Sequence, residues 1–146
     1  MPTPEERSPE IMEWLTLPSD PESLEEFRAF VLPRARKFLI PVAKLPVLEL
    51  ALEEILLNVI SYAYDGNPGL IRVGCGADRT RFVVSFRDDG KYFNPLEREE
   101  VSVDATIDDR PVGGLGIHLV KNMVDEISYR RVDESNVLEV AFTFGS

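Results

Sequence analysis

The stretch VLELALEEILLNVISYAY, residues 47–64, decides the fold. Its apolar residues recur around most of a wheel of ~100° per residue, which predicts a largely buried helix. Glu54, Asn58, Ser61 and Asp65 fall within a stripe of ~60° on that wheel. Polar groups enclosed by apolar flanks need partners when they are buried. The stripe therefore indicates the lining of a cleft rather than a solvated face.

The segments on either side of this helix predict an α+β fold. A strand is expected over 11–17. A helix then follows the capping sequence 19–22 and runs to Leu39, and Pro33 should kink or divide it. After the helix over 47–64 come strands over 71–75 and 81–87, a polar loop over 94–112, a helix over 113–126, and a hairpin of strands over 127–132 and 137–144. This order is typical of a two-layer α/β sandwich, with helices on one face of a mixed, mainly antiparallel sheet.

Composition limits the kind of protein this is. A chain of 146 residues suits one domain, and we expect a flexible N-terminal tail over 1–10 and a single domain over 11–146. Sixteen Lys and Arg against 26 Asp and Glu give a net charge of −10, which disfavours direct nucleic-acid binding. One cysteine and one histidine argue against an internal disulfide and a zinc site. With no signal-peptide pattern and no long apolar run, we expect a cytoplasmic protein without a membrane segment.

The pair Glu54 and Asn58 is the first candidate for chemistry. At a spacing of four residues, both side chains lie on one face of a helix, about one turn apart. A carboxylate beside an amide oxygen provides one base and one ligand for a hard cation such as Mg²⁺. The alternative is a surface glutamate and a core asparagine whose amide bonds to the backbone.

Two glycine-containing turns supply further candidates. In Asp88-Asp89-Gly90 a carboxylate at a strand end could accept a hydrogen bond from an exocyclic amine, although a simple strand-ending turn would have the same sequence. The run 113–116, GGLG, precedes a helix, whose N-terminal N–H groups and dipole favour phosphate. A glycine loop needed only for tight packing is the alternative there.

In order and spacing, EEILLNVISYAY, DDGKYF and GGLGIHLVKNMVDEI resemble the N, G1 and G2 boxes of the GHKL (histidine kinase-like) ATPase superfamily. The likeness is greatest to the small bacterial anti-sigma factor serine/threonine-protein kinases, and it covers nearly the whole chain. It implies an ATPase domain of that type over 11–146.

The resemblance also implies a role for each matching residue. Glu54 is expected to be the catalytic base and Asn58 the Mg²⁺ ligand, while Asp88 accepts from the adenine amino group and Gly90 gives the ring room. Gly113, Gly114 and Gly116 are expected to close a lid onto the phosphates, with Leu115 lining the pocket and Arg110 in the lid as a cation that contacts phosphate.

The implied activity is transfer of the γ-phosphoryl group of ATP to a serine or threonine of an anti-sigma factor antagonist of the STAS type. A sigma factor as a second partner and a homodimer are further implications. The alternative from a different class is a nucleotide-gated protein-binding module without phosphoryl transfer.

One expected position departs from the family pattern. The family usually has a threonine in its last strand that helps to hold the adenine end. In SNVLEVAF, Glu139 falls at about that place, so we expect Glu139 at the adenine end of the site. The alternative is a strand register that differs by one residue, which would turn this carboxylate toward solvent.

Overall fold

The computed structural model describes residues 9, 12–38, 40–97 and 114–144. These residues form five strands and three α-helices, which follow one another along the chain as β1 (Glu13–Pro18), α1 (Ser23–Lys37), α2 (Leu45–Asn58), β2 (Leu70–Ala77), β3 (Arg81–Asp88), α3 (Gly114–Met123), β4 (Glu126–Val132) and β5 (Ser135–Thr143). Short 3₁₀ turns, η1 (Val42–Lys44) and η3 (Pro95–Glu97), lie before α2 and after β3, and a π-helical turn, η2 (Val59–Ala63), continues α2.

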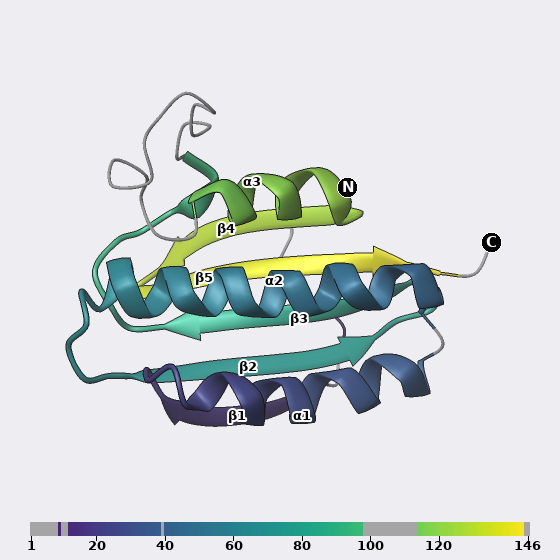
Figure 1. Cartoon of the computed structure of the whole chain (residues 1–146), viewed down its shortest axis with the longest axis horizontal. Helices are drawn as coiled ribbons and strands as arrows, with labels where there is room; N and C mark the ends of the chain where they lie inside the picture. The colour runs from purple at the N-terminus through teal and green to yellow at the C-terminus, as the bar shows by residue number, and fades with distance from the viewer. Residues whose placement is uncertain (1–8, 10–11, 39, 98–113, 145–146) are drawn as a thin grey trace.

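The strands form one sheet in the order β1-β2-β3-β5-β4, and each neighbouring pair is antiparallel. All three helices lie on the same face of this sheet (Figure 1). The expected α+β sandwich with helices on one face is therefore confirmed.

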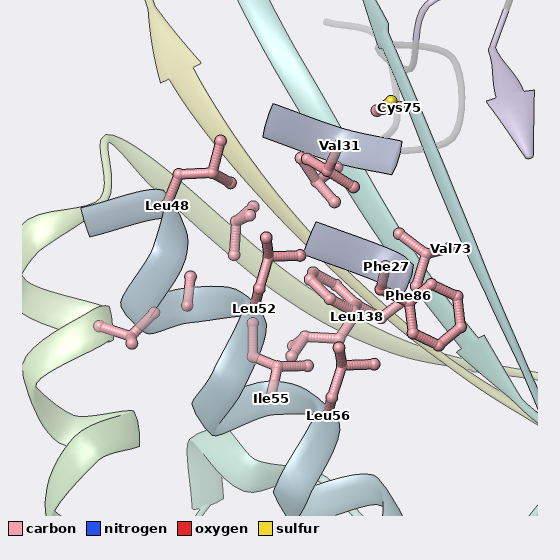
Figure 2. Close-up of a cluster of buried hydrophobic side chains, with 14 of the residues drawn as sticks. Phe27, Val31, Leu48, Leu52, Ile55, Leu56, Val73, Cys75, Phe86 and Leu138 are labelled. Carbon is pink, nitrogen blue, oxygen red and sulfur yellow. The ribbon is translucent and has the colours of Figure 1, made fainter. Parts of the chain in front are cut away.

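The core lies between α1, α2 and the sheet (Figure 2). Alternate residues of β3 and β5 point toward the helices, among them Phe86 and Leu138. From the helical layer, Phe27 of α1 and Leu52 and Ile55 of α2 meet them, and each is at most 1% exposed. Burial of one such side chain stabilises the fold by about 1.5–3 kcal/mol, so this contact fixes α2 against the sheet.

Helix α1 passes through Pro33 without being divided, which corrects part of our expectation. The helix begins at Ser23, and its N-cap residue, Glu22, makes no side-chain cap; the Asp20 side chain accepts the Glu22 N–H at 2.9 Å in the preceding turn. Pro33 lies on the exposed side of α1. Water can therefore bond the carbonyl that a proline leaves unpaired, and the helix continues.

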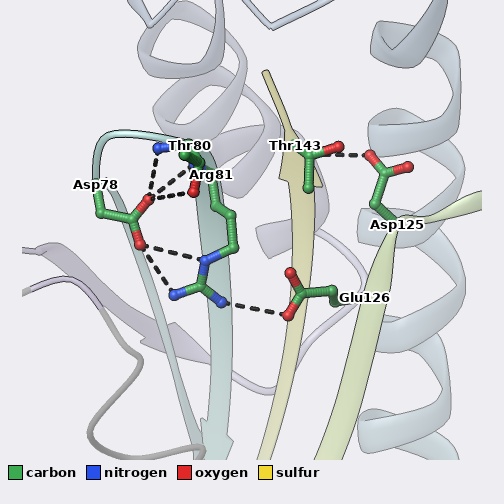
Figure 3. A network of polar contacts seen from close by, with 6 residues as sticks. All are labelled: Asp78, Thr80, Arg81, Asp125, Glu126 and Thr143. Atoms are coloured by element: carbon green, nitrogen blue, oxygen red, sulfur yellow. Dashed lines mark hydrogen bonds and ion pairs between the residues drawn. The ribbon is translucent and has the colours of Figure 1, made fainter. Parts of the chain in front are cut away.

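Polar side chains tie the far end of β3 to its neighbours (Figure 3). Arg81 pairs with Asp78 at 2.9 Å and with Glu126 at 3.4 Å. The Thr143 N–H donates to Asp125 at 2.9 Å. These contacts join the β2–β3 turn, the end of β5 and the start of β4, at the opposite end of β3 from Asp88.

The β4–β5 hairpin is tighter than the sequence suggested. Asp133 has a φ of 55°, and it forms the turn with Glu134 alone. Ser135 and Asn136, expected in the turn, are already paired residues of β5, opposite Val132 and Arg131. This earlier start of β5 decides which of its side chains reaches the site.

Candidate functional site

Asp88 is the last residue of β3, and β5 holds its side chain in place. Asn136 lies directly opposite Asp88 in the strand register, and its Nδ2 donates to Asp88 Oδ1 at 2.8 Å. The Gly90 N–H donates to the same oxygen at 2.9 Å. Both side chains are 3% exposed. Because two donors hold Oδ1, the rotamer of Asp88 is fixed.

The second oxygen of Asp88 remains available to a ligand. Oδ2 has no hydrogen-bond partner among the described residues. Burial raises the pKa of this carboxyl above its usual range, although the hydrogen bonds from Asn136 and Gly90 oppose that effect. A fixed, poorly solvated carboxyl oxygen is suited to accept from one amino group that enters from outside.

A narrow slot adjoins Asp88 between α2 and the sheet. Its walls are mainly apolar and come from α2, β3, the segment after β3, β4 and β5: Ile55, Asn58, Val59, Phe86, Asp88, Phe93, Pro95, Tyr129, Asn136 and Leu138. We refer to it as the Asp88 slot. The free space in it is about 10 Å³, about enough for one water molecule. A planar ring could therefore enter only if side chains in the wall moved apart.

Phe93 lies in the wall of this slot and is held there by its ring and by its backbone. Its ring stacks on Tyr62 with centroids 5.1 Å apart. Its N–H donates to Asn136 Oδ1 at 3.2 Å, and Tyr129 donates to that same oxygen at 2.5 Å. Asn136 Nδ2 also donates to the Lys91 carbonyl at 2.9 Å. One buried amide thus joins Asp88, the segment after β3 and β4.

Glu54 and Asn58 lie one turn apart on α2, as predicted. Asn58 is 1% exposed and lines the Asp88 slot, and its Nδ2 donates to the Glu54 carbonyl at 2.6 Å. This backbone bond is the one expected of a core asparagine, so that part of the alternative is correct. It uses the amide nitrogen, and the amide oxygen is the atom type that Mg²⁺ prefers.

The carboxyl group of Glu54 lies against the first turn of α3. A Cβ on Gly116 would overlap the Glu54 carboxyl group, so only glycine permits this approach. Glu54 Oε2 is buried without a hydrogen-bond partner among the described residues. Burial, and to a lesser extent the charge of Glu53, raise the pKa of Glu54. A base with a raised pKa is suited to proton transfer near neutral pH.

The other lid residues are only partly described. Gly114 and Leu115 begin α3, but Arg110 and Gly113 lie outside the described residues. Gly90 has a structural explanation of its own, because a Cβ there would lie 2.5 Å from the Ala63 carbonyl oxygen. Its lack of a side chain makes room for the π-helical turn η2.

The expectation for Glu139 is wrong. Glu139 pairs with Ser85 of β3 and Ser128 of β4, three residues along β5 from Asn136. An odd offset places it on the other face of the sheet from Asp88. There it lines a hollow of about 390 Å³ with Arg81 and Glu126. Asn136 is the residue of β5 that bonds to Asp88, whereas the sequence pattern had placed it within the turn.

The polar stripe predicted along residues 47–64 holds in the structure only for its first two residues, Glu54 and Asn58. Glu54 and Asn58 lie as expected, but the π-helical turn η2 changes the helical phase after Asn58. Asp65 then has a φ of 51° and pairs with Lys91 at 2.5 Å instead of lining the slot. Sequence periodicity contained no signal for this extra residue.

The side chains present fit ATP and Mg²⁺ in chemical type. Asp88 offers an acceptor for an amino group, Asn58 offers an oxygen ligand for a hard cation, and Glu54 offers a base. Within the described residues, no group of three or more His, Cys, Asp or Glu could hold a metal by itself. Mg²⁺ needs few protein ligands because it keeps waters and phosphate oxygens, so the single amide oxygen of Asn58 is compatible with it.

Comparison with known proteins gives one consistent result. A family model described as "Histidine kinase-like ATPase domain" matches residues 17–142. The chain is 28% identical over 92 residues to the serine/threonine-protein kinase BtrW of Bordetella bronchiseptica, covering 62% of this chain and 65% of that one. It is 25% identical over 134 residues to the serine-protein kinase RsbW of Bacillus velezensis, covering 88% of this chain and 82% of the relative.

A solved structure agrees in fold. The crystal structure of the RsbU and RsbW domains of Rv1364c from Mycobacterium tuberculosis superposes with a TM-score of 0.62 at 14% identity, covering 96% of this chain and 35% of that chain. The chain thus spans about a third of that protein and less than two thirds of BtrW. Among the described residues, no helix is long and apolar enough to cross a membrane.

Proposed function

Because the chain belongs to the histidine kinase-like ATPase family, we propose that it is an ATP- and Mg²⁺-dependent serine/threonine-protein kinase that acts as an anti-sigma regulatory factor. Its proposed substrate is a serine or threonine of a STAS-type anti-sigma factor antagonist. A sigma factor as a second partner, a homodimer and a cytoplasmic location belong to the same proposal.

One arrangement carries the proposal. Glu54, with its raised pKa, lies against Gly116 of α3, one helical turn from Asn58 in the wall of the Asp88 slot. A proton acceptor, a hard-cation ligand and an acceptor for an amino group therefore follow one another along a single side of α2. The names of the relatives BtrW and RsbW support a kinase at the level of the family.

Each residue has a distinct task in this proposal. When bound, ATP supplies the γ-phosphoryl group, and Mg²⁺ neutralises the charge on the phosphates. Asp88 accepts from the base, and Asn58 contributes an oxygen ligand to the cation. Glu54 takes the proton of the substrate hydroxyl. The hydroxyl oxygen then forms a bond to the γ-phosphorus while the bond between that phosphorus and ADP breaks. The backbone of α3 at Gly116 leaves Glu54 the space that this task requires.

The competing proposal is a protein-binding module without phosphoryl transfer. One observation favours it, namely that the Asp88 slot has only about 10 Å³ of free space. The base of a nucleotide can enter only if side chains in the wall of the slot move apart. If that opening does not occur, nucleotide chemistry cannot follow.

The test combines calorimetry with a transfer assay. We expect saturable binding of Mg-ATP by the wild type, binding weakened about tenfold or more in Asp88→Asn, and unchanged binding in Glu54→Gln. With radiolabelled ATP and STAS-type proteins of the same organism, Glu54→Gln should lose phosphoryl transfer. Glu49→Gln, a change to a half-exposed residue of the same helix that pairs with Arg28, is the matched control and should retain both.

The outcomes separate the two proposals. No binding of Mg-ATP by the wild type would refute the nucleotide site. The binding module would be established instead by three results together: the wild type binds Mg-ATP, Glu54→Gln regulates the partner as well as the wild type does, and neither protein yields a phosphorylated partner.

A further inference from the structure

The segment that leaves the π-helical turn η2 holds the turn after Asp88 at three successive positions. The Ala63 carbonyl accepts the Lys91 N–H at 3.0 Å. The Tyr64 hydroxyl accepts the Asp89 N–H at 2.9 Å. The Asp65 carboxylate pairs with the Lys91 ammonium group at 2.5 Å. Residues 89–91 are therefore held against the end of η2 and the two residues after it, and we refer to residues 89–91 as the Asp88 turn.

The Tyr64 hydroxyl also reaches β2. It donates to the Leu70 carbonyl at 2.6 Å while it accepts from Asp89. The β2–β3 ladder ends at the pair Ile71 and Asp88, so Leu70 and Asp89 would form the next pair. The hydroxyl takes the place of that direct backbone bond. The Tyr64 hydroxyl thus extends the ladder by one bridge, in which its oxygen atom lies between the Leu70 carbonyl and the Asp89 N–H.

The position of the hydroxyl is set on both sides of the ring. The Tyr64 ring lies against Gly69, where the Cζ atom would be 2.6 Å from an added Cβ. The π-helical turn sets the backbone of Tyr64, whose N–H donates to the Val59 carbonyl at 3.1 Å. Gly90 of the turn packs on the Ala63 carbonyl. The ring thus has little freedom to follow the turn if the turn moves.

We propose that Tyr64 is a positioning residue for recognition of the nucleobase, because its hydroxyl holds the Asp88 turn where the Asp88 carboxyl group meets the 6-amino group of adenine. This inference rests on the proposed function. Tyr64 does not line the Asp88 slot itself, so it acts through the backbone of Asp89. Its removal should affect the contact to the amino group more than contacts to the rest of the nucleotide.

The test is a thermodynamic cycle in which the Tyr64 hydroxyl of the protein and the 6-amino group of the ligand are removed singly and together. Calorimetry measures the Kd of Mg-ATP and of the Mg complex of purine riboside triphosphate, which lacks the 6-amino group. We expect the wild type to prefer ATP by about tenfold. In Tyr64→Phe, ATP binding should weaken by about five- to tenfold, while binding of the analogue changes less than about twofold.

The matched control is Tyr92→Phe. Tyr92 is 52% exposed and its hydroxyl bonds to Glu97 at 2.7 Å, outside the Asp88 slot. This variant should keep the wild-type preference for ATP. Amide hydrogen exchange gives an independent readout, since the Asp89 N–H should exchange faster in Tyr64→Phe and at the wild-type rate in Tyr92→Phe.

The results distinguish the inference from its premise. If Tyr64→Phe keeps the wild-type preference, or weakens both nucleotides equally, the positioning role is refuted and the kinase proposal stands. If the wild type binds neither nucleotide, the proposed function fails and the inference fails with it. Should Tyr64→Phe not fold, Gly69→Ala, which places a methyl group against the Tyr64 ring, must reduce the preference for ATP in the same way.

Discussion

Replacement of Asn136 by alanine is the change from which the structure predicts the largest loss of stability at the site. The side chain is 3% exposed. It donates to Asp88 and to the Lys91 carbonyl, and it accepts from the Phe93 N–H and the Tyr129 hydroxyl. Alanine removes all of these bonds at once and leaves their partners in a site with little water.

The expected magnitude follows from these partners. A typical hydrogen bond contributes about 1 kcal/mol net, and a buried group left without a partner costs about 1–3 kcal/mol. Movement of the segment after β3, which includes Phe93, would allow water to reach some of the partners and limit the loss. We therefore expect Asn136→Ala to lower the free energy of unfolding by about 2–4 kcal/mol.

Urea denaturation, followed by circular dichroism, measures this change. The control is Asn122→Ala, the same chemical change on the exposed side of α3, where the amide bonds to the His118 carbonyl at 3.0 Å. It should alter stability by less than about 0.5 kcal/mol. A loss below about 1 kcal/mol in Asn136→Ala, with an unchanged slope against urea concentration, would refute the view that this amide holds the site together.

Further predictions concern titration, reactivity and packing. Burial raises the pKa of Asp88 in the folded protein, so wild-type stability should fall, relative to Asp88→Asn, as the pH rises above about 4; equal urea midpoints of the two proteins at every pH would contradict this. Cys75 is 2% exposed and burial raises its pKa to about 11, so its thiol should react with Ellman's reagent at least about a hundredfold more slowly in the native protein than in urea. Gly90→Ala should lower the thermal midpoint markedly, because the new methyl group meets the Ala63 carbonyl. A Cβ at Gly74 would meet the ring of Trp14, a side chain that is 41% exposed rather than backbone, so a larger loss in Gly74→Ala would refute the packing argument.

The layers of the fold could be predicted because each depends on a pattern that repeats. Apolar residues of α2 recur around the helix, and those of β3 alternate, so small errors at the ends did not change the assignment. The place of Asp88 at a strand end could be predicted because Asp88-Asp89-Gly90 is a turn sequence. The place of Glu54 and Asn58 on one face could be predicted because their spacing is one helical turn, and α2 is regular across both.

The remainder of the site depends on single residues at boundaries. The sequence indicated a four-residue turn over 133–136, whereas Asp133 adopts a left-handed φ and shortens it. Asn136 was therefore left out of β5, and Glu139 was assigned to the place that Asn136 holds. Side chains alternate between the two faces along a strand. Because Glu139 lies three residues from Asn136, an odd number, the expected contact was on the other face of the sheet.

The π-helical turn η2 has a consequence for how the chain could change by insertion and deletion. It contains one residue more than an α-helical turn of the same advance, and a chain that lost one residue from 59–63 could form a regular helix there. That deletion would favour regular helical hydrogen bonding, yet it would turn Tyr64 by a fraction of a turn and remove its hydroxyl from Leu70 and Asp89. Stability of α2 and placement of the nucleobase contact therefore make opposing demands on the length of this segment.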